Sequence, residues 1–164
     1  MTQHPVPRDR SFAPGAVILC EDTVAQHLYI VKRGRVRVVK RASGAEVVLG
    51  ELGPGNLFGE MALIDHRPRS ASVIALEPTV CIELPCVLIE DLLGRANPWI
   101  SALLRILVLR LRIADDTVAG LRARSGDSGE VPVDKITERH LHRIVSSLDD
   151  PKAVAWDRLA AEDG

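Results

Sequence analysis

The chain has 164 residues and a formal net charge of −1, with 21 Lys or Arg against 22 Asp or Glu. This length suits a single domain with an appendage, and the near-neutral charge gives no electrostatic case for a nucleic-acid or membrane partner. The N-terminus lacks a signal-like segment, and no apolar run approaches the roughly 18 residues of a membrane span, so we expect a cytoplasmic protein. The three cysteines lack C-x-x-C spacing, so we expect neither a disulfide framework nor a zinc site.

Residues 1–11 are polar and contain two prolines, which predicts a loose leader. From Ala16 to Leu84 the sequence consists of short β-type runs separated by Gly, Pro or Ser. Arg33-Gly34 is interpreted as a hairpin turn between two of them. The expected strands are Leu28–Val31, Val36–Val39, Glu46–Leu49, Ser72–Leu76 and Val80–Leu84. Short strands at this spacing predict a barrel or jelly roll.

The segment from Phe58 to Val73 contains the candidate ligand-binding residues of the chain. Gly59 permits close approach of a ligand to the backbone, and the residues after Glu60 suffice for about one helical turn, whose unpaired N–H groups and positive dipole end attract a phosphate. Arg69 adds a charged, bidentate fork for phosphate oxygens, whereas an ionised Glu60 suits a sugar hydroxyl. These residues predict a ligand with one phosphate and one free hydroxyl.

This segment resembles the phosphate-binding cassette of the cyclic-nucleotide-binding domain, which occurs in protein kinase A regulatory subunits, gated channels and the bacterial catabolite activator family. The family pattern Phe-Gly-Glu-x-Ala-Leu, a variable gap and Arg-x-Ala-(Ser or Thr)-Val is met at every fixed position. The resemblance covers about 120 residues and includes Phe12-x-Pro14-Gly15, Tyr29-Ile30-Val31-x-x-Gly34 and Leu52-Gly53-Pro54-Gly55. It implies an α+β fold, an antiparallel, jelly-roll-like β-roll with a C-terminal helical lid and a long helix, over residues 12–123.

The resemblance also implies roles for individual residues. Glu60 should accept from the ribose 2′-hydroxyl, Arg69 should hold the cyclic phosphate, and backbone N–H groups of the cassette should complete the cradle. Arg67 precedes Pro68 in the variable gap and is interpreted as a solvated loop residue. The predicted ligand-binding residues are Phe58, Gly59, Glu60, Met61, Ala62, Arg69, Ser70, Ala71 and Asp115.

The base specificity is predicted from two positions. Ser70 follows the cassette arginine, where cAMP-selective kinase domains often have Ala, cGMP-selective ones have Thr, and bacterial cAMP receptors also carry Ser. Ala114-Asp115 stands where bacterial cAMP-responsive activators place Thr-Ser. An acidic side chain there can accept from the adenine amino group but also from guanine donors. The prediction favours cAMP and leaves cGMP open.

Helical spacing begins at Pro85, and a short helix is expected to end near Gly94. Asn97-Pro98 then starts a long helix that reaches about Ala123. A heptad seam along it predicts a homodimer through paired helices, the alternative being that the seam packs on the chain's own barrel. The seam residues are Leu104, Leu107, Leu111, Ala114, Val118 and Leu121, and we expect Leu103, Ile106 and Ile113 to face the barrel.

Residues 124–164 are predicted to be a linker, Ser125–Gly129, and an acidic helical tail; residues 125–164 hold nine acidic and five basic side chains. The tail is a candidate docking surface for an unknown effector protein, or it packs back on the barrel. It contains no basic segment resembling the recognition helix that bacterial relatives carry.

Catalysis and metal binding find little support. The five histidines are scattered, His140-x-His142 lies in the tail, and Asp65-His66 is interpreted as a solvated loop pair without a nucleophile. The sequence therefore predicts a non-enzymatic cyclic nucleotide receptor without a cofactor, which signals to a protein partner through its C-terminal helix. The alternative is a transcription regulator of the catabolite activator type, lacking or truncated before its DNA-binding domain. A metal-dependent barrel enzyme ranks third.

Overall fold

The computed structural model of the protein describes residues 6–126. Every strand and helix expected between residues 28 and 123 is present, with ends that differ by a few residues. The elements in chain order are β1 (Arg8–Phe12), β2 (Val17–Leu19), β3 (His27–Arg33), β4 (Val36–Ala42), β5 (Ala45–Leu52), β6 (Leu57–Phe58), α1 (Met61–Asp65), β7 (Ser72–Ala75), β8 (Thr79–Pro85), α2 (Cys86–Arg95) and α3 (Pro98–Ser125).

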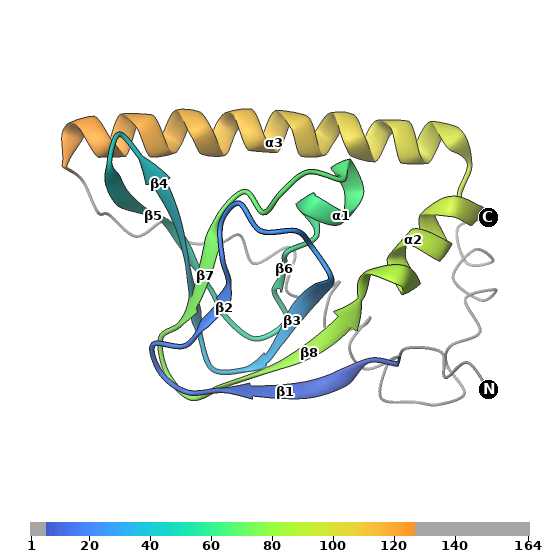
Figure 1. The fold of residues 1–164 in the computed structure, drawn as a ribbon, viewed down its shortest axis with the longest axis horizontal. Helices are drawn as coiled ribbons and strands as arrows, with labels where there is room; N and C mark the ends of the chain where they lie inside the picture. Colours follow the sequence, from blue (N-terminus) through green and yellow to red (C-terminus); the bar gives the residue numbers. More distant parts are fainter. Residues whose placement is uncertain (1–5, 127–164) are drawn as a thin grey trace.

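The strands form two antiparallel four-stranded sheets, with the orders β1-β8-β3-β6 and β2-β7-β4-β5. The sheets make a roll, which α2 and the long helix α3 follow in the chain, and this confirms the predicted fold class (Figure 1). The hairpin expected at Arg33-Gly34 is wrong, because β3 and β4 belong to different sheets. Gly34 has φ +88°, and a Cβ there would lie 2.5 Å from Thr79 Oγ1, so the chain crosses between the sheets in a tight turn against the β7–β8 connection.

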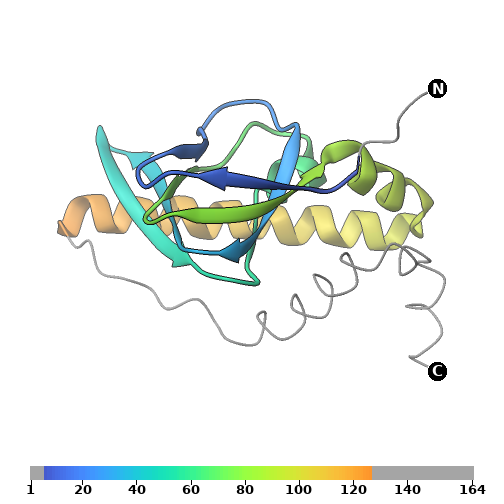
Figure 2. The ribbon, with the colours of Figure 1, turned by 90° about the horizontal axis from the view of Figure 1, so that it is seen from below.

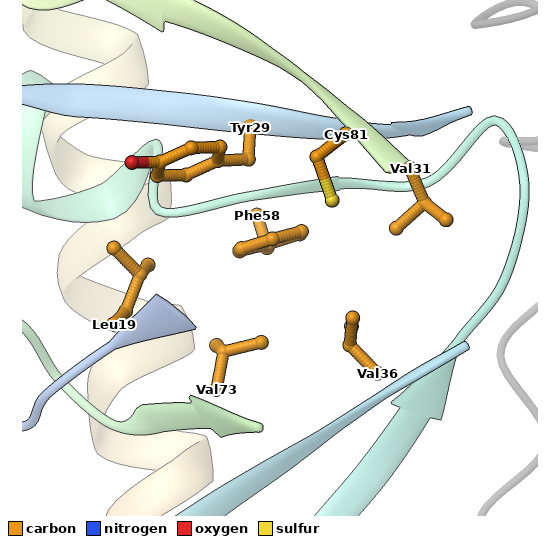
Figure 3. Close-up of a cluster of buried hydrophobic side chains, with 7 residues drawn as sticks. All are labelled: Leu19, Tyr29, Val31, Val36, Phe58, Val73 and Cys81. Carbon is orange, nitrogen blue, oxygen red and sulfur yellow. The ribbon is translucent and has the colours of Figure 1, made fainter. Parts of the chain in front are cut away.

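The core lies between the sheets, where inward-facing side chains of both meet (Figure 3). The rings of Tyr29 and Phe58 stack with their centroids 5.4 Å apart. Phe58 immediately precedes the glycine of the cassette, so the start of the cassette is fixed to the most buried part of the roll. This cluster consists of Leu19, Tyr29, Val31, Val36, Phe58, Val73 and Cys81.

The predicted leader of residues 1–11 is wrong from residue 8 onward, because residues 8–12 form β1 and pair with β8. The reason is electrostatic. Glu83 is buried in β8, and its carboxylate receives hydrogen bonds from Arg8, Arg10 and the Tyr29 hydroxyl, the last at 2.8 Å. A buried carboxylate requires such partners. The polar residues that predicted a loose leader are therefore the ones that fix this strand.

The long helix α3 begins as predicted, with the Asn97 side chain accepting from the Trp99 N–H at 3.0 Å. It lies along one side of the roll in both views and packs on α1, β4 and β5 (Figures 1 and 2). No helix within residues 6–126 is long and apolar enough to cross a membrane.

The side of α3 that faces the roll differs from the prediction. Leu103, Ile106 and Ile113 are 56%, 49% and 58% exposed, so the expectation that they face the barrel is wrong. The buried residues of α3 are Val108 and Ala119. Most of its larger apolar side chains point away from the roll, although Val108 is buried and Leu104 is partly buried. The seam residues Leu107, Leu111, Val118 and Leu121 are exposed.

Candidate functional site

The cassette starts with a sharp change of direction after β6. Gly59 has φ +85°, a conformation that L side chains rarely adopt. A Cβ on Gly59 would also lie 2.8 Å from Arg69 Nη1 and 3.0 Å from Leu19 Cδ1. Both the backbone conformation and the space around it therefore require glycine at this position.

The helical turn expected after Glu60 is present as α1. The N–H groups of Leu63 and Ile64 donate to the Glu60 carbonyl at 3.0 and 3.1 Å. Those of Met61 and Ala62 come too early in the helix to have an intrahelical acceptor. The cassette thus presents backbone donors at the positive end of a helical turn, an arrangement that suits an anion.

Arg69 is 5% exposed, and its guanidinium donates to the carbonyls of Gly59, at 2.5 Å, and His27. Burial lowers the pKa of this guanidinium, but an arginine remains charged at neutral pH. Arg67, by contrast, is exposed, as predicted for a loop residue. The two arginines of the cassette therefore differ in kind, since only Arg69 is held rigidly beside the turn at Gly59.

These residues line one cavity of about 190 Å³. Its lining includes all nine residues predicted to bind the ligand, eight from the cassette and Asp115 from α3. The apolar wall of the cavity was not predicted, because strand residues that face a cavity have the same sequence pattern as strand residues that face the core. That wall consists of Leu19, Val38, Leu52, Leu57 and Val73.

Two carboxyl groups line the same cavity. Burial raises the pKa of Glu60, and the charge of Asp115 raises it further. Burial likewise raises the pKa of Asp115, although Lys40 and Arg112 act in the opposite direction. The cavity is thus polarised, with a buried cation at Arg69 and acceptor groups at Glu60 and Asp115.

The interpretation of Asp65 as a solvated loop residue is wrong. Its carboxylate forms a bidentate ion pair with Arg112 of α3, whose Nη2 lies 2.9 Å from Oδ1. Burial alone would raise the pKa of Asp65, but the hydrogen bonds from Arg112 and from the Arg67 N–H outweigh it and hold the pKa below its usual value. His66, in the left-handed conformation after α1, is exposed as expected.

A family model described as "Cyclic nucleotide-binding domain" matches residues 9–95, which include the whole cassette. The chain belongs to the cyclic nucleotide-binding domain family. The match covers β1 to α2, so the family's characteristic region is the roll and its cassette, and α3 follows it.

Individual relatives of this cyclic nucleotide-binding domain are similar over about the same region. The "Cyclic AMP receptor protein" of Thermus thermophilus is 41% identical over 110 residues, 65% of this chain and 50% of that protein. The "cAMP-dependent protein kinase type II regulatory subunit" of Drosophila melanogaster is 41% identical over 66 residues, 40% of this chain and 18% of that protein. The chain thus spans half the length of the bacterial relative, or less in the kinase subunit.

Solved structures show the same fold. The Thermus thermophilus catabolite activator protein has a TM-score of 0.54 at 38% identity, over 66% of this chain and 52% of that chain. The cAMP-bound form of the EAL enzyme Bd1971 has a TM-score of 0.61 at 33% identity, over 68% of this chain and 30% of that chain.

Metal ligands do not gather in the part of the chain that the structure describes: residues 6–126 contain no group of three or more His, Cys, Asp or Glu side chains suited to hold an ion. The His140-x-His142 motif, the Ser125–Gly129 linker beyond Gly126 and the acidic tail lie outside the described residues.

Proposed function

We propose that this cyclic nucleotide-binding domain is a cytoplasmic, non-enzymatic receptor for cAMP, which signals to a protein partner through α3. One observation carries the proposal: the buried Arg69 guanidinium, the start of α1 and the Glu60 carboxylate line a single cavity. A cyclic phosphate at Arg69 and the α1 N–H groups brings the ribose 2′-hydroxyl towards Glu60. This arrangement supports phosphate and sugar recognition and requires no metal ion or cofactor.

The choice between cAMP and cGMP concerns only the base. The phosphate and ribose are common to both nucleotides, and the similar EAL enzyme Bd1971 has been solved in a cAMP-bound form and in a cGMP-bound form. Asp115, on α3, lines the same cavity as the cassette residues. A carboxylate can accept from the adenine amino group and equally from guanine N1–H and N2–H, so the preference for cAMP is supported instead by the relatives that are named for cAMP. We therefore favour cAMP, with cGMP as the competitor to test.

The proposed output is a change at α3. The seam side chains Leu107, Leu111, Val118 and Leu121 are exposed. Together with Leu104 and Ala114 they repeat at alternating spacings of three and four residues. An exposed apolar heptad stripe favours association with a second copy of the same helix. We propose a homodimer through α3, whose helices shift relative to the roll when ligand binds, and an effector protein that recognises the change. Neither nucleic acid nor membrane is a proposed partner.

A second candidate is a transcription regulator of the catabolite activator type. It is favoured by the bacterial relatives, one of which is named "CRP-like cAMP-activated global transcriptional regulator", from Mycobacterium tuberculosis, 28% identical over 111 residues. A gel-shift assay of the natural full-length protein with excess cAMP distinguishes the two, because DNA retention that depends on cAMP supports only the second.

Isothermal titration of the purified chain with cAMP and with cGMP tests the receptor function. The proposal expects saturable binding of one nucleotide per chain, tighter for cAMP. Binding of neither nucleotide would refute it, and tighter binding of cGMP would refute the assignment of the base.

A further inference from the structure

One turn of α3 is tied to the cassette by a nearly buried ion pair. The guanidinium of Arg112 holds both carboxylate oxygens of Asp65, at the end of α1, and its Nη2 also donates to the Pro68 carbonyl at 3.1 Å. The side chains of Arg112 and Asp65 are only 13% and 9% exposed. A bidentate arginine pair of this kind fixes orientation as well as distance.

A second tie reaches the same turn of α3 from β4. Lys40 Nζ donates to the Ser70 carbonyl of the cassette at 2.5 Å and lies 3.1 Å from Asp116 Oδ1. Glu21, itself buried, lies 3.5 Å from the same ammonium group. The side chain of Lys40 is only 15% exposed, so this second tie is also largely shielded from solvent.

Between residues 108 and 119, α3 has no buried apolar side chain, so polar contacts hold this part of the helix. Val108 and Ala119 are the buried residues of the helix, and they stand eleven positions apart, about 16 Å at a rise of about 1.5 Å per residue. The two ties fall between them. Asp115 lies in the same turn, three positions after Arg112 and one before Asp116, and lines the cavity.

We propose that Arg112 and Lys40 are positioning residues for Asp115: they hold its turn of α3 at a fixed height above the cassette, so that its carboxylate meets the amino group of a purine base. The inference rests on the proposed function and deepens it, because it makes base selectivity depend on residues that contact neither the base nor the phosphate. The charges of Lys40 and Arg112 also favour the ionised form of Asp115, the better acceptor. Both ties join α3 to the cassette, at Asp65, Pro68 and Ser70, so the residues proposed to bind phosphate and ribose are linked directly to the residue proposed to bind the base.

The test compares two ligands that differ only in the amino group, cAMP and purine riboside 3′,5′-cyclic monophosphate. Their affinity ratio is measured by titration calorimetry, with the melting temperature of the free protein measured alongside. The wild type should prefer cAMP by roughly tenfold or more, since a hydrogen bond to a charged group is involved. In Arg112→Gln and in Lys40→Gln the ratio should fall to within about threefold of one. Arg112→Lys should restore part of it, and Arg110→Gln, an exposed position on the same helix, should leave it unchanged.

A ratio that stays at the wild-type value in Arg112→Gln and Lys40→Gln, with only the melting temperature lowered, would overturn the inference and make the ties purely stabilising. A wild-type ratio near one would also overturn it, because Asp115 would then not be recognising the amino group. In both cases binding itself persists and the receptor function stands. Loss of all binding in the wild type would instead overturn the proposed function together with this inference.

Discussion

Replacing Arg69 by alanine tests the site most directly. In the free protein its guanidinium is buried and donates to the carbonyls of Gly59 and His27. With ligand bound, its remaining donors are expected to hold the cyclic phosphate. The substitution therefore removes a buried cation from beside an anion and also leaves two carbonyls without their donor.

The two effects have different magnitudes and different readouts. Two charge-assisted hydrogen bonds to phosphate contribute roughly 1.5–3 kcal/mol each, so the affinity for cAMP should fall by about 100-fold or more. Each carbonyl that loses its donor costs about 1–3 kcal/mol of stability when water cannot replace the donor. The melting temperature of the free variant should therefore fall too. Titration calorimetry on the folded variant, well below its melting temperature, isolates the binding loss.

Arg67→Ala is the matched control, because Arg67 is an arginine of the same loop that is exposed to solvent. It should change affinity by less than about twofold, as expected for a surface charge. Arg69→Lys should be intermediate, since a lysine keeps the charge but loses the planar fork. Equal weakening of cAMP binding by Arg69→Ala and Arg67→Ala would refute the assignment of Arg69 as the phosphate residue.

Three further predictions concern the dimer, the helix and pH. Leu111→Asp should convert a dimer to a monomer in sedimentation at tens of micromolar, whereas Ile113→Asp, exposed but off the seam, should not; a monomeric wild type would remove the interface. Saturating cAMP should slow hydrogen exchange across residues 110–121, and unchanged protection would make α3 a scaffold. Burial raises the pKa of Glu60 above 4.5, and a hydrogen bond donated by the ribose 2′-hydroxyl favours its ionised form. The affinity for cAMP should therefore weaken as the pH falls through that raised pKa. An equally steep pH profile in Glu60→Gln would show that another group causes the pH dependence.

The cassette was predictable from sequence because its chemistry is local. Gly59, Glu60 and the helical turn are consecutive, and Arg69 follows within one loop, so spacing alone brings them together. The N-terminus of α3 was predictable for the same reason, since Asn97 caps a helix whose first residue is Pro98. Where a few adjacent residues determine the conformation, the pattern suffices.

What could not be predicted depends on contacts between distant residues. Arg8 and Glu83, which form a hydrogen bond, are 75 positions apart in the chain. The polar sequence around Arg8 does not indicate that it pairs with a buried carboxylate. The pairing of Arg112 with Asp65 likewise spans 47 positions. The periodicity of α3 predicted apolar stripes correctly but not which stripe would face the roll, because its buried residues include Ala119, which carries little hydropathy signal.

The electrostatics of the cavity explain why a ligand with two unlike ends fits it. Glu60 and Asp115 share one cavity, burial raises the pKa of both, and the charge of Asp115 opposes ionisation of Glu60. A bound hydroxyl or amino donor stabilises each carboxylate in its ionised form, whereas a second anion beside them would be repelled. The anion is expected instead at Arg69 and at the N–H groups that begin α1, which supply charge and donors. A cyclic nucleotide meets both demands with little internal freedom, because its phosphate is closed onto the ribose and leaves the 2′-hydroxyl free, so little binding energy is lost in ordering it.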